Sequence, residues 1–240
     1  MIYITGDTHG NFERISAFCA KMTTSQEDGI IILGDAGINY YRGKKDVAIK
    51  QALCGLPVTL FCIHGNHEIR PETIPTYEFM QWGGGTVLYE KEFPNLLFAK
   101  DGEFFNLNNH KCIVIGGAYS VDKFYRLERN FGWWSDEQPS DSIKAYVEQQ
   151  LESIDYKVDI VLSHTCPLKY EPREVFLPSI DQSAVDKSTE QWLDTLEEKI
   201  SYAKWYCGHY HLQKSIDKLQ FLFDSILPFA EHGVHQGETE

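Results

Sequence analysis

The sequence lacks any long apolar run, since no stretch approaches the roughly 18 consecutive apolar residues that a membrane-spanning helix needs. It also lacks a basic N-terminal region followed by an apolar segment and a cleavage-like site. The chain instead starts with Met-Ile-Tyr-Ile-Thr-Gly-Asp, which is typical of a strand. We therefore expect a cytoplasmic protein that does not insert into a membrane.

No two of the six cysteines form a C-x-x-C pair, which is a common spacing in zinc–thiolate and redox sites. Most of them lie within apolar stretches, where a reduced thiol behaves as a small hydrophobic side chain. Disulfides are also rare in cytosolic proteins. We therefore expect free thiols in the core and no zinc–thiolate site.

Basic residues are scarce: 22 Lys and Arg stand against 35 Asp and Glu, so the formal net charge is −13. Such an acidic surface repels a phosphate backbone, and we expect no binding to long nucleic acid. A short nucleotide held in a pocket remains compatible with this charge. Repeats, low-complexity runs and domain boundaries are also lacking. The sequence predicts a single domain over residues 1–240, with a long loop at 117–140 and a frayed tail after residue 232.

Apolar runs alternate with helical patterns through much of the chain. Residues 1–5, 29–33 and 58–63 are rich in Ile, Val, Leu or Phe without clean alternation, which is typical of strands covered on both faces. Later strands are expected at 96–99, 103–107, 112–115, 158–163 and 205–207, with a closing hairpin of 215–216 and 220–224. Helices are expected at 11–22, 44–53, 71–82, 141–153 and 188–200. This order predicts a layered α/β fold with helices outside.

Five short polar clusters each follow a predicted strand directly or within a few residues. Ligands bind outside the carboxyl ends of strands in open α/β sheets, so the fold should bring these clusters together. The clusters are Gly6-Asp7-Thr8-His9-Gly10, Gly34-Asp35, Gly65-Asn66-His67-Glu68, Ser163-His164 and Gly208-His209-Tyr210-His211.

The clusters combine carboxylates with imidazoles, a mixture of donors that suits Mn, Fe, Zn or Co. An all-oxygen cage would instead favour Mg or Ca. Asp7 and His9 are two residues apart, so both side chains could reach one ion, and His209 and His211 have the same spacing. Two ions about 3.5–4 Å apart are a known arrangement for phosphoryl displacement, and a carboxylate can bridge them with its two oxygens.

In this order the clusters resemble the calcineurin-like metallophosphoesterases, whose blocks read D-x-H, G-D, G-N-H-[DE], a later H and G-H-x-H. The resemblance extends from Asp7 to His211. It implies a four-layer α/β/β/α sandwich of two mixed β-sheets flanked by helices, with a dinuclear metal site at the sheet edge. It further implies hydrolysis of a phosphate mono- or diester by metal-activated hydroxide. The substrate would be a small phosphorylated molecule or nucleotide. The cofactors would be two divalent metal ions, with Mn as the first candidate and Fe, Zn, Co or Mg as alternatives.

The resemblance also implies a role for each residue. One ion would be held by Asp7, His9 and His211, the other by Asn66, His164 and His209, with Asp35 as the bridge. His67 would bind no metal and would protonate the leaving oxygen or stabilise charge in the transition state. Each residue alone has a simpler interpretation, since Asp7 and His9 could cap a turn, and His67 or His164 could be ordinary buried or turn histidines.

The second block departs from the protein Ser/Thr phosphatase branch, which carries G-D-x-V-D-R-G. Here it reads Gly34-Asp35-Ala36-Gly37-Ile38-Asn39-Tyr40, without the Asp-Arg pair. The resemblance is therefore better to the broad bacterial and phage branch, and phosphoprotein phosphatase activity becomes a secondary hypothesis. A non-catalytic metal-binding scaffold of the same fold is a third hypothesis, and a nuclease acting on short oligonucleotides is a fourth.

Substrate contacts are expected from Arg70, just after the third block, and from the segment 117–140. That segment holds Tyr119, Lys123, Arg126 and Arg129 together with Trp133 and Trp134. Arginine can clamp a phosphate and an aromatic ring can stack on a base, which suggests a nucleotide-recognition lid. Alternatively, the tryptophans cover the core and the arginines pair with surface acids.

Overall fold

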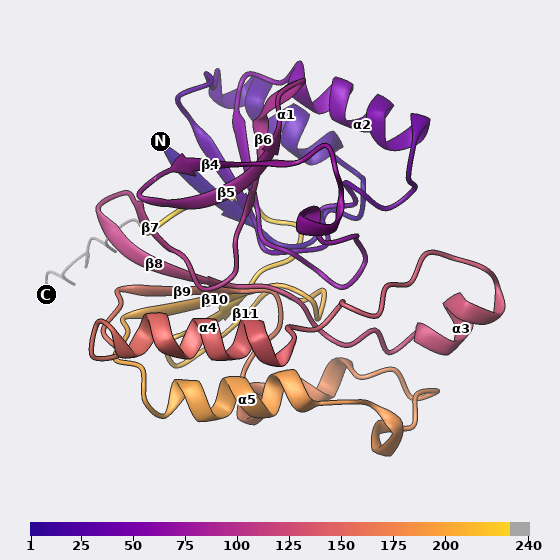
Figure 1. The fold of residues 1–240 in the computed structure, drawn as a ribbon, viewed down its shortest axis with the longest axis vertical. Helices are drawn as coiled ribbons and strands as arrows, with labels where there is room; N and C mark the ends of the chain where they lie inside the picture. The colour runs from indigo at the N-terminus through magenta and orange to yellow at the C-terminus, as the bar shows by residue number, and fades with distance from the viewer. Residues whose placement is uncertain (231–240) are drawn as a thin grey trace, which may run out of the picture.

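The computed structural model describes residues 1–230, so the tail expected after residue 232 lies outside the described residues. These residues form four layers (Figure 1). Helices α1 (Glu13–Met22) and α2 (Lys44–Cys54) cover a seven-stranded sheet, and helices α4 (Asp141–Glu152) and α5 (Ser188–Glu197) cover a six-stranded sheet. The two sheets pack against each other in the middle. This confirms the expected α/β/β/α fold.

The seven-stranded sheet has a parallel centre made of β1 (Ile2–Thr5), β2 (Gly29–Ile32), β3 (Thr59–Cys62) and β6 (Phe93–Ala99). The antiparallel strands β4 (Glu78–Trp82), β5 (Gly85–Glu90) and β13 (Leu227–Pro228) complete the order β13-β1-β2-β3-β6-β5-β4. Ile30 and Ile32 pack in the core that α1 and α2 cover, whereas Ile31 lies between the sheets. Both faces of β2 are therefore buried, which explains its continuous apolar run.

The six-stranded sheet has the order β11-β12-β10-β9-β8-β7. Its parallel strands are β8 (His110–Ile115), β9 (Ile160–Ser163), β10 (Lys204–Cys207) and β12 (Leu219–Phe221). The antiparallel strands β7 (Phe104–Leu107) and β11 (Lys214–Ile216) lie at its edges. Alternate residues again divide between two cores, because Leu162 lies between the sheets and Val161 faces α4 and α5.

The helix expected at 71–82 is wrong. The structure has one 3₁₀ turn at Pro71–Thr73, followed by strand β4, which pairs with β5 through a tight hairpin. Gly83 and Gly84 form this turn with φ values of 59° and 87°, and Gly-Gly is a typical two-residue hairpin sequence. The segment 117–140 also contains a short helix, α3 (Lys123–Glu128).

The carboxyl ends of the parallel strands bring the polar clusters to one edge of the sandwich. Asp7, Asp35 and Asn66 follow β1, β2 and β3 of the first sheet, while His164 and His209 follow β9 and β10 of the second. Of the helices within residues 1–230, none combines the length and apolar character that a bilayer crossing requires.

Candidate metal centre

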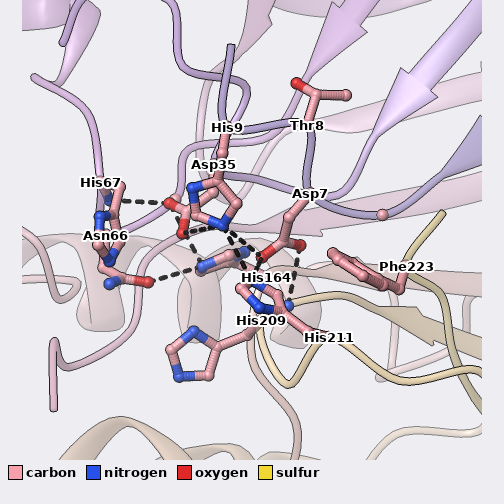
Figure 2. A network of polar contacts seen from close by, with 12 residues as sticks. Asp7, Thr8, His9, Asp35, Asn66, His67, His164, His209, His211 and Phe223 are labelled. Carbon is pink, nitrogen blue, oxygen red and sulfur yellow. Dashed lines mark hydrogen bonds and ion pairs between the residues drawn. The ribbon is translucent and has the colours of Figure 1, made fainter. Parts of the chain in front are cut away.

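The expected metal ligands converge where the two sheets meet (Figure 2). Asp7, His9 and His211 form one group whose ligand atoms lie within 4.8 Å of one another. His211 Nε2 is 3.3 Å from Asp7 Oδ2, and His9 Nε2 is 2.9 Å from His211 Nε2. Asp7 Oδ2 is buried and makes no hydrogen bond of acceptable geometry within residues 1–230. This group therefore presents ligand atoms that a cation would satisfy.

A second set of ligand atoms surrounds His164. Its Nδ1–H donates to the Leu33 carbonyl at 2.7 Å, which leaves the lone pair of the neutral ring on Nε2. Asn66 Oδ1 lies 2.8 Å from that Nε2, while the amide nitrogen of Asn66 donates to Ser120 Oγ at 2.9 Å. Two acceptor atoms thus face each other, an arrangement that a shared cation stabilises.

His209 is the third ligand expected in this second set. Its ring centroid is 4.9 Å from that of His164. Burial lowers the pKa of His209 to about 3, mainly by desolvation of the charged form. The ring is therefore neutral at ordinary pH and can serve as a ligand.

Asp35 lies between the two sets. Its Oδ1 is 3.6 Å from His164 Nε2, and its Oδ2 is 3.8 Å from His9 Nε2. Burial would raise the pKa of this carboxyl, but the neighbouring side chains of His164, His67 and His9 and the backbone N–H of His67 outweigh burial and hold the pKa below its usual value. Asp35 is therefore ionised, and each of its oxygens faces a different set of ligands, as a bridging carboxylate requires.

The backbone at the centre is strained. His9, Asp35, His209 and His211 have φ values of 46°, 47°, 65° and 50°, in the left-handed region that non-glycine residues seldom adopt. Such conformations cost about 1–3 kcal/mol each and cluster at functional sites. The neighbouring Gly34 is needed for space as well, since a Cβ there would overlap His164 Nδ1.

The model of the calcineurin-like phosphoesterase family matches residues 1–213. The chain belongs to this family. The resemblance expected from the five clusters is therefore confirmed, and membership indicates metal-dependent hydrolysis of a phosphoester. The metal-ligand groups described above fit that family chemistry.

The fold of this calcineurin-like protein is similar to that of TT1561 of Thermus thermophilus, with a TM-score of 0.50 and 14% identity over 92% of this chain and 87% of that chain. AQ665 from Aquifex aeolicus, a protein of unknown function, is 14% identical over 71% of this chain and 81% of its own, with a TM-score of 0.27. None of the curated proteins matches the chain.

His67 of the calcineurin-like protein lies beside the ligands and lines a cavity that opens onto them. Its backbone N–H donates to Asp35 Oδ1 at 2.7 Å, and its Nε2 is 3.8 Å from Asp122 Oδ1. Burial lowers the pKa of His67 despite attraction to Asp35. His67 also forms a possible metal-binding group with His9 and Asp35. The geometry of His67 is thus compatible with either a proton donor to the substrate or a metal ligand.

Of the five residues expected to contact the substrate, one lines the cavity and four do not. Tyr119 lines the cavity. The other four are absent from its lining in the described chain: Arg70, Lys123, Arg126 and Arg129. The Arg70 guanidinium is buried and donates to Asp101 Oδ2 at 2.7 Å. The Lys123 ammonium lies 4.2 Å from the centre of the Trp133 ring, and the Arg129 guanidinium lies 5.6 Å from the Tyr125 ring.

Arg126 is buried and is connected to the candidate metal centre through a hydrogen bond to Ser120. Its Nη1 donates to Ser120 Oγ at 3.0 Å, and the same oxygen accepts from Asn66 Nδ2. Neither Ser120 nor Asp122 belongs to a motif, so both were missed by sequence reasoning. The sequence signal that could have indicated them is the long segment 117–140 in which both lie.

Ser120→Ala should weaken metal binding by about ten-fold, because the Asn66 amide loses the partner that orients its oxygen toward the site. Titration of metal-free protein with Mn²⁺ would measure the change. Ser215→Ala, at an exposed position on β11, is the matched control and should bind as the wild type does. Unchanged affinity in Ser120→Ala would contradict the orienting role.

Glu190, in the first turn of α5, lines the same cavity and was also missed. It is 4% exposed, and burial raises its pKa to about 7 although Thr165 Oγ1 donates to it at 2.8 Å. The folded protein therefore binds this proton more tightly than the unfolded chain does. As pH rises from about 4.5 to 7, stability contributed by the neutral carboxyl is lost.

Glu190→Gln should remove this pH dependence. Between pH 4.5 and 8 the metal-free wild type should lose on the order of 3 kcal/mol of unfolding free energy more than the variant does. Urea unfolding at both pH values would measure the difference. If the free energy of unfolding changed with pH in the same way for both proteins, the Glu190 carboxyl would not be protonated in the folded protein.

Proposed function

We propose that the protein is a hydrolase that uses two divalent ions, held by Asp7, His9 and His211 and by Asn66, His164 and His209, to cleave a phosphate ester. One observation carries the proposal, namely the convergence of acceptor atoms that lack hydrogen donors. Asp7 Oδ2 has no partner of good geometry within residues 1–230, and His164 Nε2 faces Asn66 Oδ1 at 2.8 Å. Mixed imidazole and carboxylate donors suit Mn, Fe, Zn or Co; we propose Mn first, with Fe, Zn, Co or Mg as substitutes.

The bound ions supply Lewis acidity, which lowers the pKa of a coordinated water and neutralises charge on the phosphoryl oxygens. The chain supplies the rest. Asp35 holds its negative charge between the two ligand sets, supported by the N–H of His67. His67 faces the cavity and gives a proton to the leaving oxygen, while the Asp122 carboxylate favours its protonated form.

Hydrolysis of p-nitrophenyl phosphate and bis-p-nitrophenyl phosphate by metal-stripped protein tests the proposal. Adding Mn²⁺ should restore turnover, and the preferred compound separates monoesterase from diesterase chemistry. Metal bound in stoichiometric amount with no turnover of either compound, or of natural phosphate esters, would favour a non-catalytic scaffold instead.

A further inference from the structure

A cavity of about 490 Å³ extends from the candidate metal centre toward the segment between β9 and α5. His9, Asp35, Asn66 and His67 line one end. In Figure 1, α3 and the segment that leads into α5 project from the same end of the molecule. The loop just before α3 and the segment that leads into α5 both contribute to the cavity, through Val121 and Phe176 respectively. A substrate with its phosphate at the metal centre would therefore place its organic group between these segments.

The far end of the cavity has an apolar wall. Val175, Phe176, Leu177, Ile180 and Val185 all line it. Val175 and Leu177 belong to the large apolar side chains that stay exposed in the folded chain. Phe176 also lies nearly parallel to Tyr210, with an interplanar angle of 18° and 6.3 Å between ring centres. Apolar side chains gathered in a concave site are typical of a pocket that buries an apolar ligand group.

The charges that line the cavity are unfavourable for a second anion. Four acidic side chains outside the proposed ligand set line the cavity, those of Asp122, Glu171, Asp186 and Glu190, and burial raises the pKa of Glu190 to about 7, so its charge develops only near and above neutral pH. In the described part of the chain its lining includes one ammonium group, that of Lys187, which lies 2.7 Å from Glu171 Oε2. Glu190 Oε2 is buried without a hydrogen-bond partner among residues 1–230. Among the described residues, an anionic group in this cavity would meet like charges and no cation that lacks an ion-pair partner.

We infer that the substrate is a phosphate ester whose organic group is apolar and carries no second anionic group, and that this group packs against the wall formed by Val175, Phe176 and Ile180. The inference rests on the proposed function, because that function places the phosphate at the metal centre. Nucleoside di- and triphosphates are disfavoured as substrates, since their further phosphates would meet the acidic side chains that line the cavity.

Binding of three non-hydrolysable phosphonates to the Mn-loaded protein tests this inference by calorimetry, without requiring turnover. Hexylphosphonate and 5-carboxypentylphosphonate have similar lengths and differ in whether the chain ends in a methyl group or a carboxylate. Methylphosphonate lacks the chain. Hexylphosphonate should bind at least about ten-fold more tightly than either of the others, because it alone fills the apolar wall without adding a charge.

Val175→Lys should raise the affinity for 5-carboxypentylphosphonate by about ten-fold, because it places a cation in the wall. Val47→Lys is the matched control, since Val47 lies on α2 and is 40% exposed against 39% for Val175. The control should leave all three affinities unchanged. Both positions are exposed enough that a lysine should be accommodated in the folded protein.

Equal affinity for hexylphosphonate and 5-carboxypentylphosphonate in the wild type would overturn the inference, and so would failure of all three to bind. An effect of Val47→Lys equal to that of Val175→Lys would overturn the placement of the organic group at this wall. These outcomes are separate from the proposed function, which fails only when the metal-loaded protein hydrolyses no phosphate ester.

Discussion

Asp35→Asn should lose bound metal and on the order of 10³-fold or more in kcat/KM. Asparagine keeps the shape of the side chain but removes its charge, and it replaces one of the two oxygens with an N–H donor. Those oxygens face His164 Nε2 and His9 Nε2 at 3.6 and 3.8 Å, so one change affects both ligand sets. Metal content by mass spectrometry and Mn-dependent turnover of p-nitrophenyl phosphate would measure the two effects.

Asp46→Asn is the matched control for this change. Asp46 is also a buried carboxylate that accepts backbone N–H donors, from Tyr41 and Arg42, but it lies outside the ligand groups. Its variant should lose stability and still bind metal. Full metal content and turnover in Asp35→Asn would exclude the bridging role, whereas equal metal loss in both variants would point to general unfolding.

The strands that carry the site were predictable because the burial of each strand shows in the residues of the strand itself. β1, β2, β3, β9 and β10 are covered on both faces, so each appears as a short continuous apolar run. Strand β4 was missed because it lies at the edge of its sheet and only Met80 and Trp82 pack, partly buried, against the core between the sheets. Phe79 in β4 is 63% exposed, and the pairing with β5 that makes this segment a strand leaves no period in the sequence.

The residues proposed as metal ligands could be found in the sequence for a related reason, since each follows a strand directly or within a few residues. The residues around them depend instead on contacts distant in sequence. Arg70 was expected to contact phosphate, but its partner Asp101 is 31 residues away and comes from the turn after β6. Ser120 comes from the loop before α3 and Glu190 from the first turn of α5, and their partners Asn66 and Thr165 are 54 and 25 residues away. No local pattern encodes these contacts.

His67→Ala should leave both metals bound and lower kcat by about 10²–10⁴-fold for an alkyl phosphate. The metals should stay because alanine retains the backbone N–H that donates to Asp35 Oδ1 at 2.7 Å. The rate should fall because an alkoxide needs a proton as it leaves. The loss should be much smaller for p-nitrophenyl phosphate, whose leaving group is stable as an anion. Parallel measurements of metal content and kcat on both substrates would check this.

The same comparison separates an acid from a ligand, since His67 also groups with His9 and Asp35 as possible metal donors. A ligand's removal would lower metal content and slow both substrates equally, with turnover per bound metal retained. Asp122→Asn provides a second check, because its carboxylate is 3.8 Å from His67 Nε2 and belongs to no proposed ligand set. This variant should lose only about ten-fold in kcat, because it weakens the proton donor without removing it. The loss should again be larger for the alkyl phosphate than for p-nitrophenyl phosphate.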